Sequence, residues 1–264
     1  MLRSMYAGIS GMKNFQTKLD VIGNNIANVN TSGFKKGRIT FQDMMSQTVS
    51  GAQGPTENRG GVNPSQVGLG SQLGSIDNVH TQGFRQTTNR PLDFAIEGDG
   101  MFVLKSDGSS YYTRAGNFYL DEDRNIVNPE GHYLIGVDGG EITLPEGYKS
   151  FSIQSNGTVS IVNKEGNPED VGQIALAMFS NASGLEKAGS NLYLDSNNAG
   201  LINELEMPQV NGAGAIVSNS LEMSNVDLAE EFTEMITAQR GFQANTRIIT
   251  TSDEILQELV NLKR

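Results

Sequence analysis

Apolar stripes at helical spacing run along both ends of the chain, and they constrain the fold more than any other feature of the sequence. In the first stripe, apolar side chains recur at alternating intervals of three and four residues, as they do along one face of an α-helix. Gly8, Gly11 and Gly23 interrupt this helix at about 1 kcal/mol each relative to Ala, so we expect it to need a packing partner. The stripe consists of Leu2, Met5, Ile9, Met12, Phe15, Leu19, Ile22, Ile26 and Val29.

The C-terminal stripe supplies a suitable partner. Its apolar residues follow a heptad track that Gln239, Thr246 and Asp253 interrupt. These polar residues either meet solvent or a small gap, or they set the register between helices, as buried polar residues do in some coiled coils. The apolar members of the track are Leu228, Phe232, Met235, Phe242, Ile249, Leu256 and Val260, and we expect Leu259 beside them to contribute to the same interface.

The ends of the second helix are marked by charged residues. Asp227 followed three residues later by Glu230 is the pattern of an N-cap with a capping-box glutamate. Lys263 and Arg264 are suited to the negative end of the helix dipole. We therefore predict a helix from about residue 228 to residue 262.

Between the helices the sequence changes character. Residues 31–70 are rich in Gly, Ser, Thr and Asn, which indicates an extended, flexible connector. Residues 71–220 consist of short alternating apolar runs separated by turn pairs, which is typical of hairpins in an antiparallel sandwich or barrel. The turn pairs are Asp99-Gly100, Asp107-Gly108, Asp138-Gly139 and Asn156-Gly157.

The predicted fold class is therefore α+β. Residues 1–30 and 221–264 would form a helical domain, with the two helices paired as in a coiled coil. Residues 31–70 would connect it to an inserted, all-β domain at residues 71–220. A helix pair of this length buries only part of its apolar surface, and neighbouring subunits can cover the rest.

Composition limits the classes of partner. The formal net charge is −11, from 30 acidic and 19 basic residues, so a phosphate backbone or an anionic membrane would repel most of the chain. The absence of cysteine excludes disulfides, thiol catalysis and thiolate metal sites. The sequence has neither the apolar run of a secretory signal nor that of a membrane span. We expect no nucleic acid partner, no membrane insertion, and export, if any, without a cleaved signal.

Few residues are available for catalysis or metal binding. His80 lies in a polar connector and His132 beside a turn, where we interpret both as surface or loop residues. The GLGSQLG segment at 68–74 places its third glycine one residue too late for a dinucleotide fingerprint. The DEDRN segment at 121–125 lacks the later glycine and glutamate of a calcium loop. The sequence predicts no catalytic, cofactor-binding or metal site, and therefore no enzyme.

Four sets of motifs, taken in order along the chain, resemble those of the flagellar rod and hook family. They are LDVIGNNIANVN at 19–30 with GFK at 33–35, DFAIEGDGMF at 93–102, YTRAGNF at 112–118, and EMSNVDL at 222–228 with MITAQRGFQAN at 235–245. A chance match at both termini and in the middle is very improbable. The positions that match the family's terminal motifs are Asn24, Asn25, Asn28, Gly33, Phe34, Asn225, Val226, Asp227, Gln239 and Arg240.

The resemblance implies a structural subunit that polymerises into a tube, with the helices forming its inner wall and the β domain lying outside. It implies unfolded export through the flagellar type III apparatus, location in the hook or basal body, and contacts with other axial, cap and junction proteins. Residues 256–263 and 239–243 favour a hook protein, which would form a curved, flexible tube. The chain length and residues 41–70 suit a distal rod protein equally well.

The rival class is a soluble β-domain module that binds carbohydrate or mediates adhesion. It would account for the middle of the chain but would leave both apolar stripes unexplained.

Overall fold

The computed structural model describes residues 2–56, 59–106, 108–164 and 166–262. The chain separates into two compact units, which we call the helical unit and the β unit. Two packed terminal helices and a β-rich domain give the α+β class that the sequence predicts. The helical unit comprises Met1–Ala27, Gly37–Asp77 and Asp227–Arg264, and the β unit comprises Asn28–Lys36 and Asn78–Val226.

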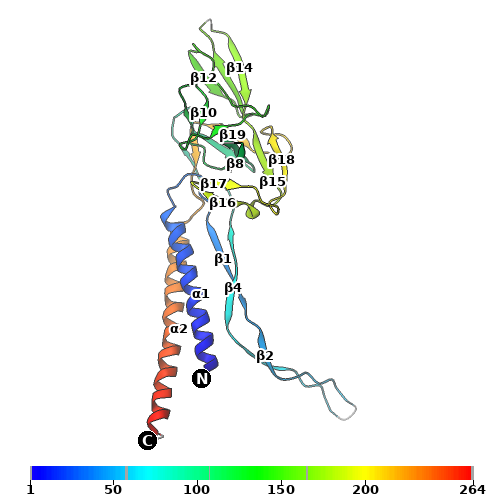
Figure 1. The fold of residues 1–264 in the computed structure, drawn as a ribbon, viewed down its shortest axis with the longest axis vertical. Helices are drawn as coiled ribbons and strands as arrows, with labels where there is room; N and C mark the ends of the chain where they lie inside the picture. The colour runs from blue at the N-terminus through cyan, green and yellow to red at the C-terminus, as the bar shows by residue number, and fades with distance from the viewer. Residues whose placement is uncertain (1, 57–58, 107, 165, 263–264) are drawn as a thin grey trace. The chain divides into compact units, whose positions relative to one another are not determined.

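The helical unit is built on α1 (Leu2–Ala27) and α2 (Leu228–Leu262), which lie side by side and run antiparallel (Figure 1). The second helix begins as predicted, because Asp227 Oδ1 accepts a hydrogen bond from the backbone N–H of Ala229 at 2.8 Å. The glycines of α1 make that helix weak on its own, so most of its stability must come from packing.

Two-stranded ribbons occupy most of the remaining part of the helical unit. Strand β1 (Gly37–Asp43) pairs with β4 (Ser71–Asn78), and β2 (Ser46–Ser50) pairs antiparallel with β3 (Ser65–Gly68). These strands lie in and just beyond the segment for which the sequence indicated a flexible connector. Most of their residues are exposed, so no apolar alternation marked them as strands.

The β unit contains a large antiparallel sheet of 9 strands. Its order is β16-β17-β8-β7-β11-β10-β9, and β15 pairs with both β7 and β18. The strands are β7 (Met101–Ser106), β8 (Ser109–Thr113), β9 (Tyr119–Leu120), β10 (Ile126–Val127), β11 (Tyr133–Leu134), β15 (Leu176–Phe179), β16 (Glu186–Gly189), β17 (Leu192–Leu194) and β18 (Leu201–Glu206).

Smaller antiparallel groups complete the unit, and a short 3₁₀ helix spans Ala182–Gly184. Strands β12, β13 and β14 form a sheet in that order, β6 pairs with β19, and β5 pairs with β20. Their bounds are β5 (Arg85–Thr87), β6 (Phe94–Glu97), β12 (Ser150–Ile153), β13 (Thr158–Val162), β14 (Pro168–Gln173), β19 (Ala215–Ser218) and β20 (Ser220–Glu222).

An aromatic cluster forms the centre of the β unit. Phe94, Phe102 and Phe118 are completely buried, and the rings of Phe102 and Phe118 meet edge to face with centroids 5.4 Å apart. Aliphatic side chains from the large sheet, from β13 and from the β6–β19 pair pack around them. The predicted turn at Asn156-Gly157 joins β12 to β13, and Gly157 has a φ of 80°, which L side chains rarely adopt. The β unit therefore has a core of its own.

Candidate assembly surfaces

Close approach of the two helix backbones depends on glycine. A Cβ placed on Gly241 would lie 2.5 Å from the ring of Phe15, and one placed on Gly11 would lie 2.9 Å from the side chain of Asn245. A Cβ on Gly8 would touch Ile249 at an ordinary 3.5 Å. The sequence suggested that Gly8 and Gly11 only weaken α1, whereas the structure shows that they make room for α2.

Polar groups lie at the end of the helix contact where α1 ends and α2 begins. The amide of Asn25 is buried and donates to the carboxylate of buried Glu231 at 3.3 Å, and it also bonds the backbone of Gly37 in both directions at 2.9 Å. Lys18 forms an ion pair with Glu234 further along the same contact. These bonds determine which turns of the helices lie opposite each other, since a shift would leave buried polar groups without partners.

The predicted apolar stripe of α1 lies mainly inside the helical unit. Ile22 is buried, whereas Ile9 is 45% exposed. The side chain of Leu2 lies outside the described residues, and Val29 follows the helix in the β unit. The half-buried members of the stripe are Met5, Met12, Phe15, Leu19, Ile26 and Val29.

The predicted track of α2 divides into two groups. Met235, Phe242, Ile249 and Leu256 are half-buried. Sequence reasoning missed the residues that α2 buries most, because it gave weight to apolar side chains and these are small or polar. They are Glu231, Ala238 and Ser252. The exposed members of the predicted track are Leu228, Phe232 and Val260, and Leu259 beside them is also exposed.

The polar residues on the predicted track also differ in how far they are buried. Gln239 and Asp253 are exposed, which agrees with the interpretation that the track meets solvent there. Thr246 is half-buried and donates hydrogen bonds to the Phe242 carbonyl at 3.0 Å and to the Met12 sulfur at 3.6 Å. The register-setting role that we considered for these residues is filled instead by Asn25 and Glu231.

A buried ionic cluster organises the β unit. The Glu222 carboxylate accepts hydrogen bonds from Lys35 Nζ and Arg114 Nε, each at 2.6 Å, and all three residues are buried. Lys35 also donates to the Thr81 carbonyl at 2.8 Å, and Arg114 donates to the carbonyl of Gly98 at 2.5 Å and to that of Gly100. Segments far apart in the sequence are therefore held at one point.

Burial and charge act in opposite directions on the pKa values of this cluster. Burial lowers the pKa of Lys35, and the charge of Glu222 offsets this only in part. Burial alone would raise the pKa of Glu222, but the charges of Arg114 and Lys35 and their hydrogen bonds lower it overall. The carboxylate is therefore ionised and paired, which suits a structural link.

Gly33, one of the matching N-terminal motif positions, contacts the backbone of this cluster. Gly33 has a φ of 71°, its N–H donates to the Glu222 carbonyl at 2.8 Å, and a Cβ there would lie 2.5 Å from the backbone of Ala115. Phe34 is buried, with the Lys187 ammonium 5.2 Å from the centre of its ring. Asn28 accepts a hydrogen bond from the Thr31 hydroxyl at 3.2 Å, and Asn24 is exposed.

The C-terminal motif positions have equally distinct environments. Asn225 accepts a hydrogen bond from the Lys36 N–H at 2.8 Å and donates to the Val79 carbonyl at 2.8 Å, so it joins three segments. Val226 is buried. Gln239 and Arg240 are exposed on α2.

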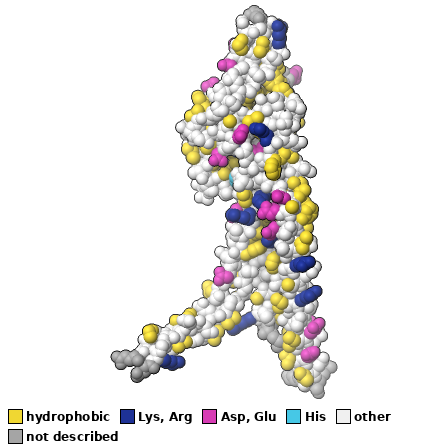
Figure 2. All heavy atoms as spheres, turned by 180° about the vertical axis from the view of Figure 1, so that it is seen from behind, with side chains coloured by type: hydrophobic (Ala, Val, Ile, Leu, Met, Phe, Trp, Pro, Cys, Tyr) yellow, Lys and Arg dark blue, Asp and Glu magenta, His cyan; other side chains and the backbone are white. Residues whose placement is uncertain are grey.

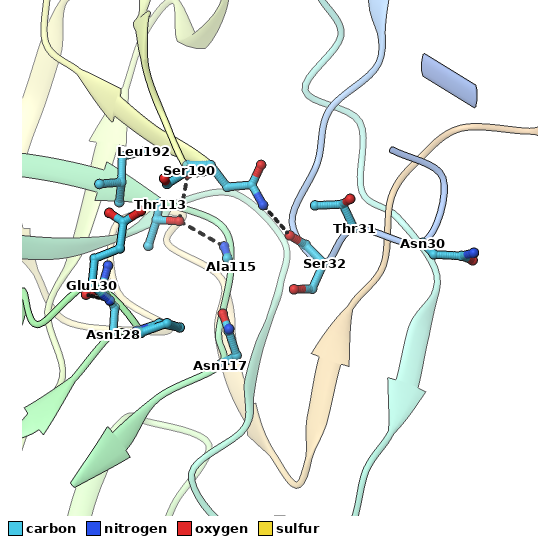
Figure 3. Close-up of a pocket in the computed structure, with 12 residues that line it drawn as sticks. Asn30, Thr31, Ser32, Thr113, Ala115, Asn117, Asn128, Glu130, Ser190 and Leu192 are labelled. Atoms are coloured by element: carbon cyan, nitrogen blue, oxygen red, sulfur yellow. Dashed lines mark hydrogen bonds between the residues drawn. The ribbon is translucent and has the colours of Figure 1, made fainter. Parts of the chain in front are cut away.

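A polar cavity of about 390 Å³ lies in the β unit (Figure 3). Small polar side chains line it, and several already bond one another: Thr113 donates to the Asn191 carbonyl at 2.9 Å, and Asn191 donates to the Ser32 carbonyl at 3.1 Å. Glu130 supplies an ionisable group, but no nucleophile and base meet there among the described residues. The cavity does not have the composition of a catalytic site.

The environment of His80 differs from the prediction. Its ring nitrogens are buried without a hydrogen-bond partner in the described part of the chain, and the ring lies 5.6 Å from that of Tyr193. Burial, together with the charges of Lys35, Lys187 and Arg114, lowers the pKa of His80 to about 4. The sequence could not indicate this, because the cations come from distant segments.

The described ranges contain neither a metal-binding cluster nor a helix that could span a membrane. No group of His, Asp and Glu there is arranged to hold a metal ion. Over the same part of the chain, no helix has the length and apolarity needed to cross a membrane.

Family models match both termini and the middle of the chain. The model described as "Flagella basal body rod protein" matches residues 5–35, "Flagellar hook protein FlgE/F/G D1 domain" matches 95–161, and "Flagellar basal body rod FlgEFG protein C-terminal" matches 217–262.

Curated relatives align along the whole sequence. The flagellar basal-body rod protein FlgG of Bacillus subtilis is 58% identical over 264 residues, with 100% of both chains covered. The flagellar hook protein FlgE of Borreliella burgdorferi is 31% identical over an alignment of 442 residues, again with 100% of both chains covered.

A solved structure, that of Helicobacter pylori flagellar hook protein FlgE2, aligns with 62% of this chain and 47% of its own at 16% identity. Its TM-score of 0.24 is too low to support a structural argument. The full-length matches and the terminal motifs lead to one conclusion: the chain belongs to the family of flagellar rod and hook axial proteins.

Proposed function

We propose that this chain is a structural subunit of the distal rod of the bacterial flagellum. The observation that carries the proposal is the 58% identity to a basal-body rod protein over the full length of both chains. The hook relative aligns at 31%, over 442 positions compared with the 264 residues of this chain. The hook interpretation that the terminal segments favoured is therefore replaced by its alternative.

The preference for a hook rested on segments that do not separate the two kinds of protein. Residues 239–243 and 256–263 lie largely within the match to a C-terminal model that is named for both rod and hook proteins. Helices of both kinds of subunit must meet the same packing requirement, so their apolar stripes look alike.

In the proposed assembly, α1 and α2 pack in a coiled-coil-like inner layer and the β unit lies outside. The exposed apolar residues of α2, among them Phe232 and Leu259, meet neighbouring subunits. The chain is exported through the flagellar type III apparatus, is located in the basal body, and contacts other axial proteins. Its role is to transmit torque, with no catalysis and no cofactor.

Polymerisation of the purified chain tests the proposal. At rising concentration we expect straight, stiff tubes under negative-stain electron microscopy. Curved and flexible tubes would favour the hook instead. A chain that remains monomeric and binds glycans would favour the adhesive β module.

Two substitutions on α2 separate contacts within a subunit from contacts between subunits. Ile249→Asp places a charge against Gly8, so it should loosen the helix pair as well as block tubes. Phe232 is 50% exposed, so Phe232→Asp should leave the helix pair and the β unit folded and still prevent sedimentation of polymer. Thr233→Asp, at an exposed neighbouring position, is the matched control and should polymerise normally.

A further inference from the structure

An apolar groove lies on the face of α1 opposite the one that contacts α2. Its volume is about 440 Å³, its walls are Tyr6, Ile9, Met44 and Leu69, and the basic residues Arg3 and Lys13 border it. Tyr6 is 68% exposed and Ile9 is 45% exposed, so water covers a surface that folding leaves open.

The groove has a defined wall because the chain between β3 and β4, together with the first residue of β4, is attached to α1. Asn14 donates to the Ser71 hydroxyl at 2.9 Å, and the Ser71 N–H donates to the Ser10 hydroxyl at 3.3 Å. A Cβ on Gly70 would lie 2.3 Å from that same hydroxyl. These contacts hold Leu69 beside the helix.

The C-terminal end of α2 extends beyond the start of α1. The contacts of Gly8 with Ile249 and of Asn25 with Glu231 set an antiparallel register. At equal rise per residue, the start of α1 lies opposite about residue 255, so roughly the last two turns of α2 project beyond it. Figure 1 shows this projection.

The projecting end is apolar and acidic. Leu259, Val260 and Leu262 are 48%, 65% and 83% exposed. Glu254 and Glu258 lie beside them, and hydrophobic and acidic side chains gather at this end of the helix pair in Figure 2. The two basic residues that follow in the sequence lie outside the described residues.

We propose that the C-terminal end of α2 of one copy docks in the α1 groove of a neighbouring copy. The proposal rests on the tubular assembly proposed above and names one contact within it. Leu259 and its apolar neighbours fill the groove, and the acidic residues meet Arg3 and Lys13. A chain's own α2 cannot do this, because it packs on the opposite face of α1.

The geometry of this contact suits polymerisation. The groove and the helix end are different surfaces of the same chain, so the contact is heterologous and leaves one of each free at every step. Apolar filling supplies most of the affinity, while the opposite charges select the correct partner surface.

Cysteine cross-linking tests the contact directly, because the chain has no cysteine of its own. Chains with Ile9→Cys are mixed with size-tagged chains with Leu259→Cys and oxidised. The disulfide-linked products are then measured in the soluble and the sedimented fractions. We expect the mixed cross-linked product to exceed either product of like chains. Absence of the mixed product from both fractions, or a majority of like-chain products, would overturn the proposal.

Charge reversal provides a second test with an internal control. Arg3→Glu with Lys13→Glu, or Glu254→Lys with Glu258→Lys, should each raise the concentration needed for polymer roughly tenfold. The chain with all four changes should polymerise near the original concentration, because its groove and its helix end again carry opposite charges. Circular dichroism checks that every variant is folded.

The outcomes separate this contact from the proposed function. Tubes from all charge variants at the original concentration, without mixed cross-links, would reject the contact and leave the rod assignment standing. A chain that never forms tubes would reject the rod assignment, and cross-linking in the soluble fraction would still decide the contact.

Discussion

The β unit and the helical unit bury their residues in opposite ways. In the β unit, Phe94, Phe102 and Phe118 are completely buried and belong to a core that the unit closes by itself. In the helical unit, α2 extends over 35 residues, yet the side chains it buries are Glu231, Ala238 and Ser252. One unit buries its apolar residues in a core, and the other leaves most of them half-buried or exposed.

Buried polar groups show the same contrast. In the β unit, Glu222, Lys35 and Arg114 are buried and satisfy one another, so the loss of any one is costly. In the helical unit, Asn25 and Glu231 specify register in a contact with little apolar burial around it. We therefore expect substitutions in the β unit to act on folding, and substitutions on the helices to act on pairing and assembly.

The largest effect is expected from Glu222→Gln. The substitution leaves Lys35 and Arg114 buried without a carboxylate, which should cost about 3–5 kcal/mol of the unfolding free energy of the β unit. Because the pKa of Glu222 is lowered below its ordinary 4.5 on folding, its contribution is full above that pH and is lost as the pH falls through the folded value. Denaturant titration monitored by near-UV circular dichroism measures both effects.

Glu146→Gln is the matched control. This residue also pairs with an arginine, Arg124, at 2.5 Å, but its side chain is 84% exposed. Its loss should leave the unfolding midpoint of the β unit unchanged, since water replaces the partner. Equal losses for both variants would show that burial of Glu222 does not determine its contribution.

The second effect is a pH dependence due to His80. Its pKa is about 4 in the folded chain, and its ordinary value is 6.5. Between those values the unfolded chain binds the proton more readily, so stability should fall as the pH falls from 6.5 to 4. The slope should reach about 1.4 kcal/mol per pH unit, with a total of about 2–3 kcal/mol.

His80→Leu should remove this part of the pH dependence and leave stability at pH 7 equal or higher, because the buried ring nitrogens have no partner to lose. His132→Leu is the control, since it retains His80 and should retain the slope. If His80→Leu leaves the acid slope intact, the loss between pH 6.5 and 4 comes from other groups.

The third effect concerns glycine in the helix pair and should have opposite signs at two positions. Alanine gains about 1 kcal/mol over glycine in a helix. At Gly241 the added methyl group meets the Phe15 ring at 2.5 Å, so crowding of about 1–3 kcal/mol should exceed that gain. At Gly23 no described residue lies within 4 Å of the methyl position, so Gly23→Ala should stabilise the unit.

Thermal unfolding followed by helical circular dichroism, at one chain concentration, compares Gly241→Ala with Gly23→Ala. Stabilisation by both would mean that the helices do not approach closely at Gly241. Destabilisation by both would mean that, in solution, the added methyl group at Gly23 meets a group that does not lie near it in the structure.

Sequence periodicity predicted where the helices lie better than how they touch. The predicted helix from about 228 to 262 matches α2, because both its cap at Asp227 and its heptad track are local signals. The contact itself was missed, because backbone approach at Gly8, Gly11 and Gly241 produces it, and small residues carry no hydrophobic signal. Glycines spaced three residues apart on the stripe could have indicated it.

The ionic cluster of the β unit could not be derived from spacing at all. Lys35 and Glu222 are 187 residues apart, and Arg114 and Glu222 are 108 apart. A signal was nevertheless present, since each of the three lies within a segment that resembles a family motif. Residues shared between distant motifs are candidates for contact, and only the fold could show that these three form one charged group.

The smallest effect is expected in the ribbon formed by β2 and β3. This ribbon belongs to the helical unit but contributes little to its stability. Among the described residues, none comes within 4 Å of a Cβ placed on Gly51 or Gly60, and the strands β2 and β3 beside them are mainly exposed. Gly51→Pro with Gly60→Pro should therefore change the unfolding free energy of either unit by less than about 0.5 kcal/mol. In a rigid rod the tubes should be straight before and after the change, and Gly51→Ala with Gly60→Ala should behave identically. Curved tubes from the unmodified chain that the proline pair straightens would identify the ribbon as a compliant joint, because proline restricts the backbone where glycine allows it to move. That outcome would favour the hook over the rod while leaving the folding contrast between the two units intact.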